Sequence, residues 1–261
     1  MTPHILIVPG SFMPAEFYIP LRNALLALGN AASIAPLLSA GRRARRPATK
    51  EEDATHIREE IRTLVERGEE VAVAMHSYGA IPGTESVRGL LRAERRRKGK
   101  SGGVVRLVYM AGVVPGVGAS LNEVMAPWIE RYKEMSYVRV EGDYLTHELE
   151  LSARITFSDL PFEEGMHWAR RMVAQSGVSF DGKLVYPGYR DVAVSYVVCT
   201  QDMCVPLELQ RAMIRRMEME SGRKVHVMEL NSGHSLMVSR LEEAAKFIDT
   251  AIEKGYLFSR L

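Results

Sequence analysis

The feature that most constrains the fold is a series of short, valine-rich apolar runs that recur along the chain. Polar residues do not alternate cleanly with the apolar ones, as they would in a strand with one solvated face. The pattern is typical of parallel strands that helices cover on both sides. The runs are HILIVP (4–9), EVAVAM (70–75), VVRLVYM (104–110), VAVSYVVC (192–199) and KVHVMEL (224–230), with AASIAPL (31–37) as a candidate for one more.

Helical patterns separate these runs. Thr49, followed by acidic residues, predicts a capped helix start, and Gly29 predicts a helix end. The alternation of strand and helix predicts an α/β fold with a doubly wound, mostly parallel sheet. Right-handed crossovers then bring the loops that follow the strands to one edge of the sheet. The predicted helices are 17–29, 49–68, 208–222 and 241–255.

One long segment, from Pro115 to Arg190, interrupts this alternation because it contains no strong strand pattern. Its helical patterns, at 120–135 and 162–177, favour a helical cap over the carboxyl edge of the sheet. The alternative is a set of surface helices that take no part in any site. The predicted division is an α/β core of residues 1–114 and 191–261 with a helical cap of residues 115–190.

Composition limits the function classes open to the chain. A formal net charge of +2 gives no strong attraction to nucleic acid or to an anionic membrane. No apolar run approaches the roughly 18 to 20 residues that span a bilayer, and the N-terminus lacks the basic start of a secretory signal. Two cysteines, Cys199 and Cys204, are too few for a disulfide framework or a zinc site. We therefore expect a soluble, cytoplasmic protein that binds neither nucleic acid nor membrane.

Two basic clusters could instead indicate binding to nucleic acid or a nuclear signal. GRRARRP (41–47) and RAERRRKGK (92–100) have the composition of a nucleic-acid patch or a nuclear signal. Both lie between predicted elements, and no aromatic residues are interleaved with them. We therefore expect them to be exposed loops or helix ends.

Three polar residues follow three of the predicted strands. Ser77 comes after the run 70–75, Asp202 after the run 192–199 and His234 after the run 224–230. Parallel strands would bring all three to one edge of the sheet.

The chemistry explains why these three residue types matter together. An imidazole can take the proton of a serine hydroxyl and so make it nucleophilic, and a carboxylate holds the imidazole in the required tautomer. The chain order serine, aspartate, histidine is the order in α/β-hydrolase triads.

Two backbone amides are candidates for an oxyanion hole. A strand-to-helix turn points the amide of Tyr78 toward the space beside Ser77. A second donor is expected in VPGSFMP (8–14), where Gly10 allows close approach of the backbone and the amide of Ser11 or Phe12 follows. We favour Ser11.

Each of these residues alone has an ordinary structural explanation. Ser77 could simply end a buried strand, Asp202 could stabilise a turn or begin a helix, and His234 could lie in a surface loop. Their joint occurrence, in order and at matching strand ends, favours the triad. His76 lacks this context and is expected to pack or hydrogen-bond beside the turn.

At these residues the chain resembles the α/β-hydrolase superfamily. MHSYGA (75–80) looks like the nucleophile elbow, CTQDMCVPLELQ (199–210) like the acid loop and LNSGHSLMVS (230–239) like the histidine loop. The resemblance covers nearly the whole chain and is strongest to the small, short-cap branch of plant methylesterases and hydroxynitrile lyases. HSYGAIPG (76–83) and YPGYRDVAVSYVVC (186–199) are similar to fungal stand-alone hydrolases, some of them found with secondary-metabolite pathways.

Four positions depart from the patterns of that branch. Its hydroxynitrile lyases carry a lysine where this chain has Ser235 and a threonine where it has Gly10, so the resemblance implies ester hydrolysis rather than lyase chemistry. Pro9 replaces the usual histidine of the oxyanion loop. Met75 replaces the first glycine of the Gly-x-Ser-x-Gly elbow, which requires its flexible side chain to turn away into the core.

The sequence therefore predicts a serine hydrolase that cleaves a carboxylic ester, thioester or lactone of a small apolar molecule. No metal or organic cofactor is expected, and either a monomer or a homodimer fits the sequence. The alternatives are a cyclase or lyase of secondary metabolism that uses His234 as a base, and a small-molecule binding protein on the same scaffold. The apolar residues expected to line a substrate pocket are Phe12, Met125, Trp128, Met135, Trp168 and Met172.

Overall fold

The computed structural model describes residues 2–131 and 136–258. Its main sheet has six strands in the order β2-β1-β3-β4-β8-β9, and every neighbouring pair is parallel. The predicted fold class is thereby confirmed, and the short run at 31–37 supplies an edge strand. The strands are β1 (His4–Val8), β2 (Ala32–Ile34), β3 (Glu70–His76), β4 (Gly103–Met110), β8 (Ala193–Cys199) and β9 (His226–Leu230).

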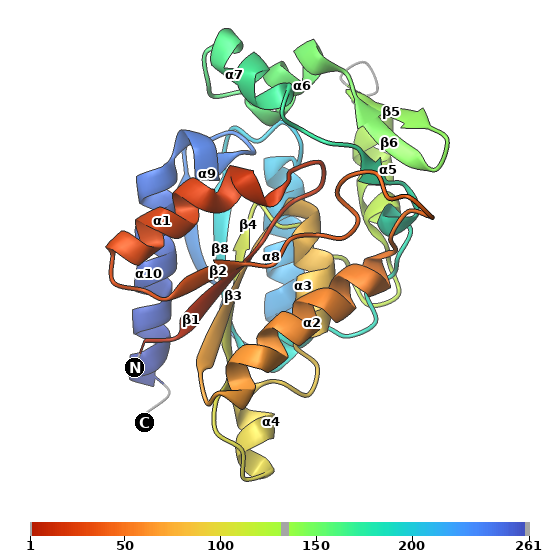
Figure 1. The fold of residues 1–261 in the computed structure, drawn as a ribbon. Coiled ribbons are helices and arrows are strands. Elements are labelled where there is room, and N and C mark those ends of the chain that lie inside the picture. The colour runs from red at the N-terminus through yellow and green to blue at the C-terminus, as the bar shows by residue number, and fades with distance from the viewer. Residues whose placement is uncertain (1, 132–135, 259–261) are drawn as a thin grey trace.

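Helices cover both faces of this sheet (Figure 1). Two of them, α1 and α10, lie on one face, while α2, α3 and α8 lie on the other. A short helix, α4, projects at the end of the molecule where the strands begin. The bounds are α1 (Ile19–Ala27), α2 (Lys50–Glu66), α3 (Ala80–Ser86), α4 (Arg92–Arg97), α8 (Leu207–Ser221), α9 (Leu236–Ser239) and α10 (Leu241–Phe258).

Local sequence signals account for the ends of these helices. The Thr49 hydroxyl accepts from the amide of Glu52, whose carboxylate accepts from the Thr49 amide, so α2 begins with a capping box. Gly222 ends α8 with a φ of 67°, a left-handed conformation that glycine adopts without steric cost.

The segment 115–190 differs from the prediction of a purely helical cap. It contains a second, three-stranded antiparallel sheet in the order β5-β6-β7. Sequence periodicity misses these strands because β5 exposes most of its residues and β7 spans only Gln175–Ser176. Figure 1 shows α6 and α7 above the carboxyl ends of the main sheet. The other elements are α5 (Leu121–Arg131), β5 (Val138–Glu141), β6 (Tyr144–His147), α6 (Leu149–Thr156) and α7 (Phe162–Ala169).

The two basic clusters lie mainly at the surface, as expected. Residues 42–46 are exposed in a loop, and residues 96–100 are exposed at the end of α4. Arg95 is the exception in its cluster because it is buried and bonds to Glu66. Among the described residues, no helix is both long enough and apolar enough to cross a membrane.

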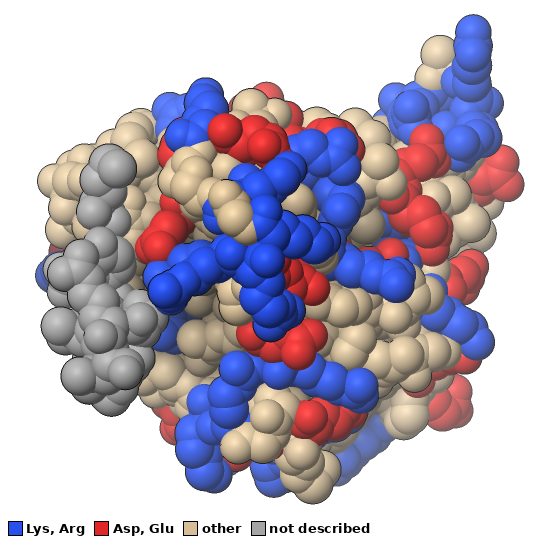
Figure 2. All heavy atoms as spheres, turned by 90° about the horizontal axis from the view of Figure 1, so that it is seen from below, with Lys and Arg blue, Asp and Glu red and all other residues tan. Residues whose placement is uncertain are grey.

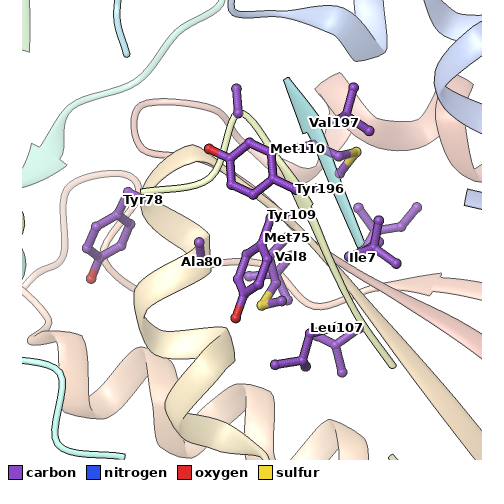
Figure 3. Close-up of a cluster of buried hydrophobic side chains, with 14 of the residues drawn as sticks. Ile7, Val8, Met75, Tyr78, Ala80, Leu107, Tyr109, Met110, Tyr196 and Val197 are labelled. Carbon is purple, nitrogen blue, oxygen red and sulfur yellow. The ribbon is translucent and has the colours of Figure 1, made fainter. Parts of the chain in front are cut away.

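The core beneath the elbow explains how the chain accommodates Met75. Its side chain is fully buried beside Val8 and Tyr109, between the sheet and α3 (Figure 3). A Cβ atom added at Gly83 would lie 2.5 Å from the Met75 sulfur, so this glycine provides the space that the side chain fills. The expectation that Met75 turns into the core is confirmed.

Restoring the usual elbow glycine should therefore destabilise this protein. We predict that Met75→Gly lowers the free energy of unfolding by about 3 kcal/mol, because it leaves a cavity under Gly83 and loosens a strand. Urea denaturation measures the change. The control Met219→Ala removes a methionine side chain that is 77% exposed, and it should change stability by less than about 0.5 kcal/mol. Equal midpoints for wild type and Met75→Gly would contradict the packing described.

Candidate active site

Ser77 lies in a strained turn directly after β3 and is the first residue of the short 3-10 helix η2 (Ser77–Gly79). Its φ is 51°, a left-handed conformation that costs a non-glycine residue about 1–3 kcal/mol. The turn packs tightly under the end of β1, since a Cβ atom at Gly79 would lie 2.1 Å from the Pro9 carbonyl oxygen. The second glycine of the elbow is thus required by close backbone contact, whereas the first can be a methionine.

The structure brings Ser77, His234 and Asp202 together in one hydrogen-bonded chain. The Ser77 Oγ lies 3.0 Å from His234 Nε2, and His234 Nδ1 lies 2.8 Å from Asp202 Oδ2. An ionised carboxylate only accepts hydrogen bonds, so Nδ1 carries the ring proton and donates a hydrogen bond to Asp202. In the neutral imidazole Nε2 is then the acceptor for the serine hydroxyl. All three side chains are buried.

The turn that follows β8 holds Asp202 in place. Its Oδ1 atom accepts hydrogen bonds from the amides of Cys204, at 2.7 Å, and Val205, at 2.8 Å. Asp202 therefore stabilises its own turn, the ordinary explanation considered above, and at the same time bonds to His234. Because both carboxylate oxygens are engaged, the imidazole is held in one orientation.

One group of three potential metal ligands occurs among the described residues. It consists of Asp202, Cys204 and His234, whose ligand atoms lie within 4.8 Å of one another. Both carboxylate oxygens of Asp202 and both ring nitrogens of His234 already form the hydrogen bonds just described. We assign the group no metal role, because the donor set is already used as a histidine–carboxylate pair.

His76 links the loop after β1 to the histidine loop. It is fully buried, which holds its pKa well below 6.5, and the nearby His234 lowers that pKa further. Its Nε2–H donates to the His234 carbonyl at 3.0 Å, so Nδ1 accepts from the Tyr18 hydroxyl at 2.7 Å. The Tyr18 oxygen accepts from the Gly10 amide at 2.8 Å. A Cβ atom at Gly10 would lie 2.6 Å from His76 Nδ1, so this contact requires glycine.

A second buried network joins the same loop to Tyr78. The Phe12 amide donates to the Gln175 side chain at 3.2 Å, and Gln175 donates to the Ser39 hydroxyl at 2.8 Å. Ser39 donates to Asp53 at 2.5 Å, and the Tyr78 hydroxyl donates to the same carboxylate oxygen at 2.9 Å. Burial raises the pKa of Asp53, while these hydrogen bonds oppose the rise.

These networks distinguish the amides of the loop after β1. The Gly10 amide bonds to Tyr18 and the Phe12 amide to Gln175. Ser11, between them, lines the cavity beside Ser77 and has no amide hydrogen bond to any described residue. Phe12 has a φ of 61°, so the loop reverses sharply after Ser11. The Tyr78 amide belongs to the first turn of η2, where amides have no partner within the helix.

A cavity of about 260 Å³ opens beside Ser77 and His234. Phe12, Met125 and Trp128 line it, and so does Met172. Met135 lies outside the described residues.

Trp168 does not line this cavity among the described residues, contrary to the prediction. Its ring packs against Phe17, with the ring centres 5.1 Å apart, and Arg171 lies over it. The apolar face of α7 thus joins the core beside the 3-10 helix η1 (Ala15–Tyr18) rather than the cavity.

Sequence reasoning missed several residues at this site. Cys204 and Val205 line the cavity because they follow Asp202 in the same turn. Their closeness to Asp202 in the sequence is the signal that could have identified them. Asp53 belongs to the acidic residues that follow Thr49, yet it lies on the buried stripe with Ile57 and Ile61. A charged residue within an apolar stripe is the signal that marks it. Tyr18, Phe180, Tyr137 and Gln175 carried no distinctive pattern.

Comparison with known proteins establishes the family. A model of the alpha/beta hydrolase family matches residues 5–249, and the chain therefore belongs to that family. "Probable hydrolase R7" from Phoma sp. is 33% identical over 233 residues, which cover 89% of this chain and 91% of that protein. "Alpha/beta hydrolase nvfD" from Aspergillus novofumigatus is 25% identical over 252 residues, which cover 96% and 97% of the two chains.

A solved structure shows the same fold. The crystal structure of polyneuridine aldehyde esterase superposes with a TM-score of 0.73 at 18% identity, covering 96% of this chain and 100% of the esterase. The comparisons confirm the resemblance to the superfamily that the three sequence motifs indicated.

The buried His76 should make stability depend on pH. Its folded pKa lies below the unfolded value, so its contribution is complete above about pH 6.5 and is lost as the pH falls below that value. We predict that His76→Gln reduces the pH slope of unfolding free energy between pH 6.5 and 5 by up to about 1.4 kcal/mol per pH unit.

Urea denaturation at several pH values measures this slope. The matched control is His167→Gln, which changes an exposed histidine on α7 and should keep the wild-type slope. An unchanged slope in His76→Gln would show that His76 does not carry the linkage.

Proposed function

We propose that the protein is a serine hydrolase that cleaves a carboxylic ester, thioester or lactone of a small apolar molecule. The observation that carries the proposal is the continuous hydrogen-bonded chain from Ser77 through His234 to Asp202 at the floor of a cavity. In this arrangement Ser77 is the nucleophile, His234 the general base and then acid, and Asp202 the residue that orients His234.

The reaction follows from the positions of the protons. The Ser77 oxygen attacks the substrate carbonyl while its proton passes to His234 Nε2, and the imidazolium formed is stabilised by Asp202. His234 then protonates the leaving alcohol or thiol as the carbonyl reforms, which leaves an acyl-serine. Water then attacks the acyl group while its proton passes to the same nitrogen. As the bond between the acyl carbon and the Ser77 oxygen breaks, His234 returns this proton to the Ser77 oxygen and the acid is released. These steps use a small-molecule substrate and need no cofactor.

The oxyanion of each tetrahedral intermediate requires donors fixed in advance. We assign this role to the amides of Ser11 and Tyr78. The Ser11 assignment is supported by the hydrogen bonds that engage the amides on either side of it. The Tyr78 assignment is supported by its position directly after the nucleophile, in the first turn of a helix.

The cavity favours an uncharged, apolar substrate. Phe12, Met125 and Trp128 contribute apolar surface, and methionine adapts to irregular shapes. Among the described residues that line the cavity there is no Asp, Glu, Lys or Arg. A charged acyl or alcohol group would therefore be buried there without an ion-pair partner, which is costly.

Substitution of the nucleophile tests the proposal. With p-nitrophenyl esters as substrates, we predict that Ser77→Ala lowers kcat by about 10⁴-fold or more, because the covalent step is lost. His234→Ala should cause a loss of similar size. The control Ser101→Ala changes an exposed serine that precedes β4 and should leave the rate unchanged.

Two results would contradict the hydrolase proposal. Retention of most turnover by Ser77→Ala, with loss in His234→Ala, would indicate that His234 acts as a base without a covalent serine step, as in a base-driven cyclase or lyase. Saturable binding of esters without turnover by the wild type would indicate a binding protein.

A further inference from the structure

A second cavity lies at the opposite end of the main sheet, where the strands begin. It has a volume of about 240 Å³ and is bordered by the first residues of β3, β4 and β8, by α4 and by Ile252 of α10. Figure 2 views the molecule from this end and shows Lys and Arg side chains gathered across the face, with acidic side chains between them. Three arginines line the cavity: Arg92, Arg106 and Arg223.

Arg106 is the unusual member of this group. It lies on β4 between the neighbouring strands β3 and β8, and the residue is 93% buried. Its side chain donates to the Ser195 hydroxyl at 2.8 Å. Its Nε–H is buried and has no hydrogen-bond partner. No described carboxylate lies within ion-pair distance of it. A buried guanidinium without a counter-charge is costly, and burial lowers the pKa of Arg106.

The other charged residues that line the cavity each have a hydrogen-bond partner. Arg92 donates to Glu70 Oε1 at 2.8 Å, so these two charges offset each other. The second oxygen of Glu70 is buried and has no partner. Arg223 donates to backbone carbonyls between residues 189 and 192, and Asp191 accepts from the Tyr186 hydroxyl. Arg106 and Glu70 thus both line the cavity, and each carries a buried polar atom that has no partner.

We propose that this cavity binds a phosphate group, either inorganic phosphate or a small phosphate ester in its singly protonated form. Phosphate oxygens accept from Arg106 and supply its missing counter-charge, while Arg92 and Arg223 contribute further N–H donors at the rim. The P–OH group donates to the free oxygen of Glu70, which would repel a fully ionised anion. Sulfate and acetate carry no such proton at neutral pH and are expected to bind more weakly.

This site is separate from the candidate active site, because the two cavities share no lining residue. Phosphate binding and ester hydrolysis can therefore be tested apart. Failure of either proposal leaves the other standing.

A titration with inorganic phosphate tests the proposal. Thermal unfolding midpoints are measured at pH 7 and constant ionic strength, and ³¹P NMR line widths give a direct measure of binding. The wild type and Ser77→Ala should both show saturable stabilisation, because ligand that binds only the folded state raises its stability. Arg106→Met should weaken binding by about tenfold or more, since it removes a charge-assisted donor but keeps the side-chain volume.

Two further variants control for the loss of one positive charge and for a folding defect in Arg106→Met. Arg97→Gln removes one positive charge from an exposed position on α4, outside the cavity, and should bind phosphate like the wild type. Arg92→Gln, on the rim, should weaken binding several-fold even if Arg106→Met does not fold.

The site proposal is overturned if the wild type shows no saturable phosphate binding, or if Arg92→Gln and the folded Arg106→Met variant bind as tightly as Arg97→Gln. Phenyl phosphate in a parallel titration distinguishes an ester site from one for free phosphate. Equal affinity for sulfate and phosphate would overturn the role given to Glu70.

Discussion

The close contact between the loop after β1 and the turn after β3 is the constraint on which the rest of the site depends. Two glycines make it possible, because side chains at Gly10 and Gly79 would collide with His76 and with the Pro9 carbonyl. Ser77 has a left-handed conformation in this contact, and Ser11 lines the same cavity. The free energy stored in this strained turn is offset by the fully buried core beneath it.

Two polar networks extend this contact to the rest of the molecule. Through Tyr18 and His76 the loop is bonded to the backbone of His234, so the position of the imidazole depends on the loop. Through Gln175, which comes from the segment 115–190, it is bonded to Ser39 and Asp53. Since buried polar groups are costly unless every partner is present, both networks favour one arrangement of the site.

The sequence predicted the layers of the fold because buried parallel strands and amphipathic helices have strong, local patterns. It also predicted that Ser77, Asp202 and His234 would share one edge of the sheet, since strand ends in a parallel sheet converge there. The small sheet in the segment 115–190 was missed because β5 is mostly exposed and β7 spans only two residues, so neither has an apolar pattern. Trp168 was misplaced because composition does not tell which face of a helix meets the core and which meets a cavity.

The polar networks could not be predicted for a different reason. Gln175 and Phe12 are bonded across 163 residues of sequence, and neither belongs to a recognisable motif. Such contacts depend on how the segment 115–190 folds back over the core, which is a property of tertiary packing. Tyr18 and His76 are likewise bonded across 58 residues of sequence, between η1 and the end of β3.

A fluorophosphonate probe shows whether His234 and Asp202 make Ser77 a nucleophile. The folded protein is labelled and the modified peptide is located by mass spectrometry. We expect one stoichiometric adduct on Ser77, which disappears in Ser77→Ala and forms far more slowly in His234→Ala. Folded wild-type protein that carries no adduct on Ser77 would contradict it.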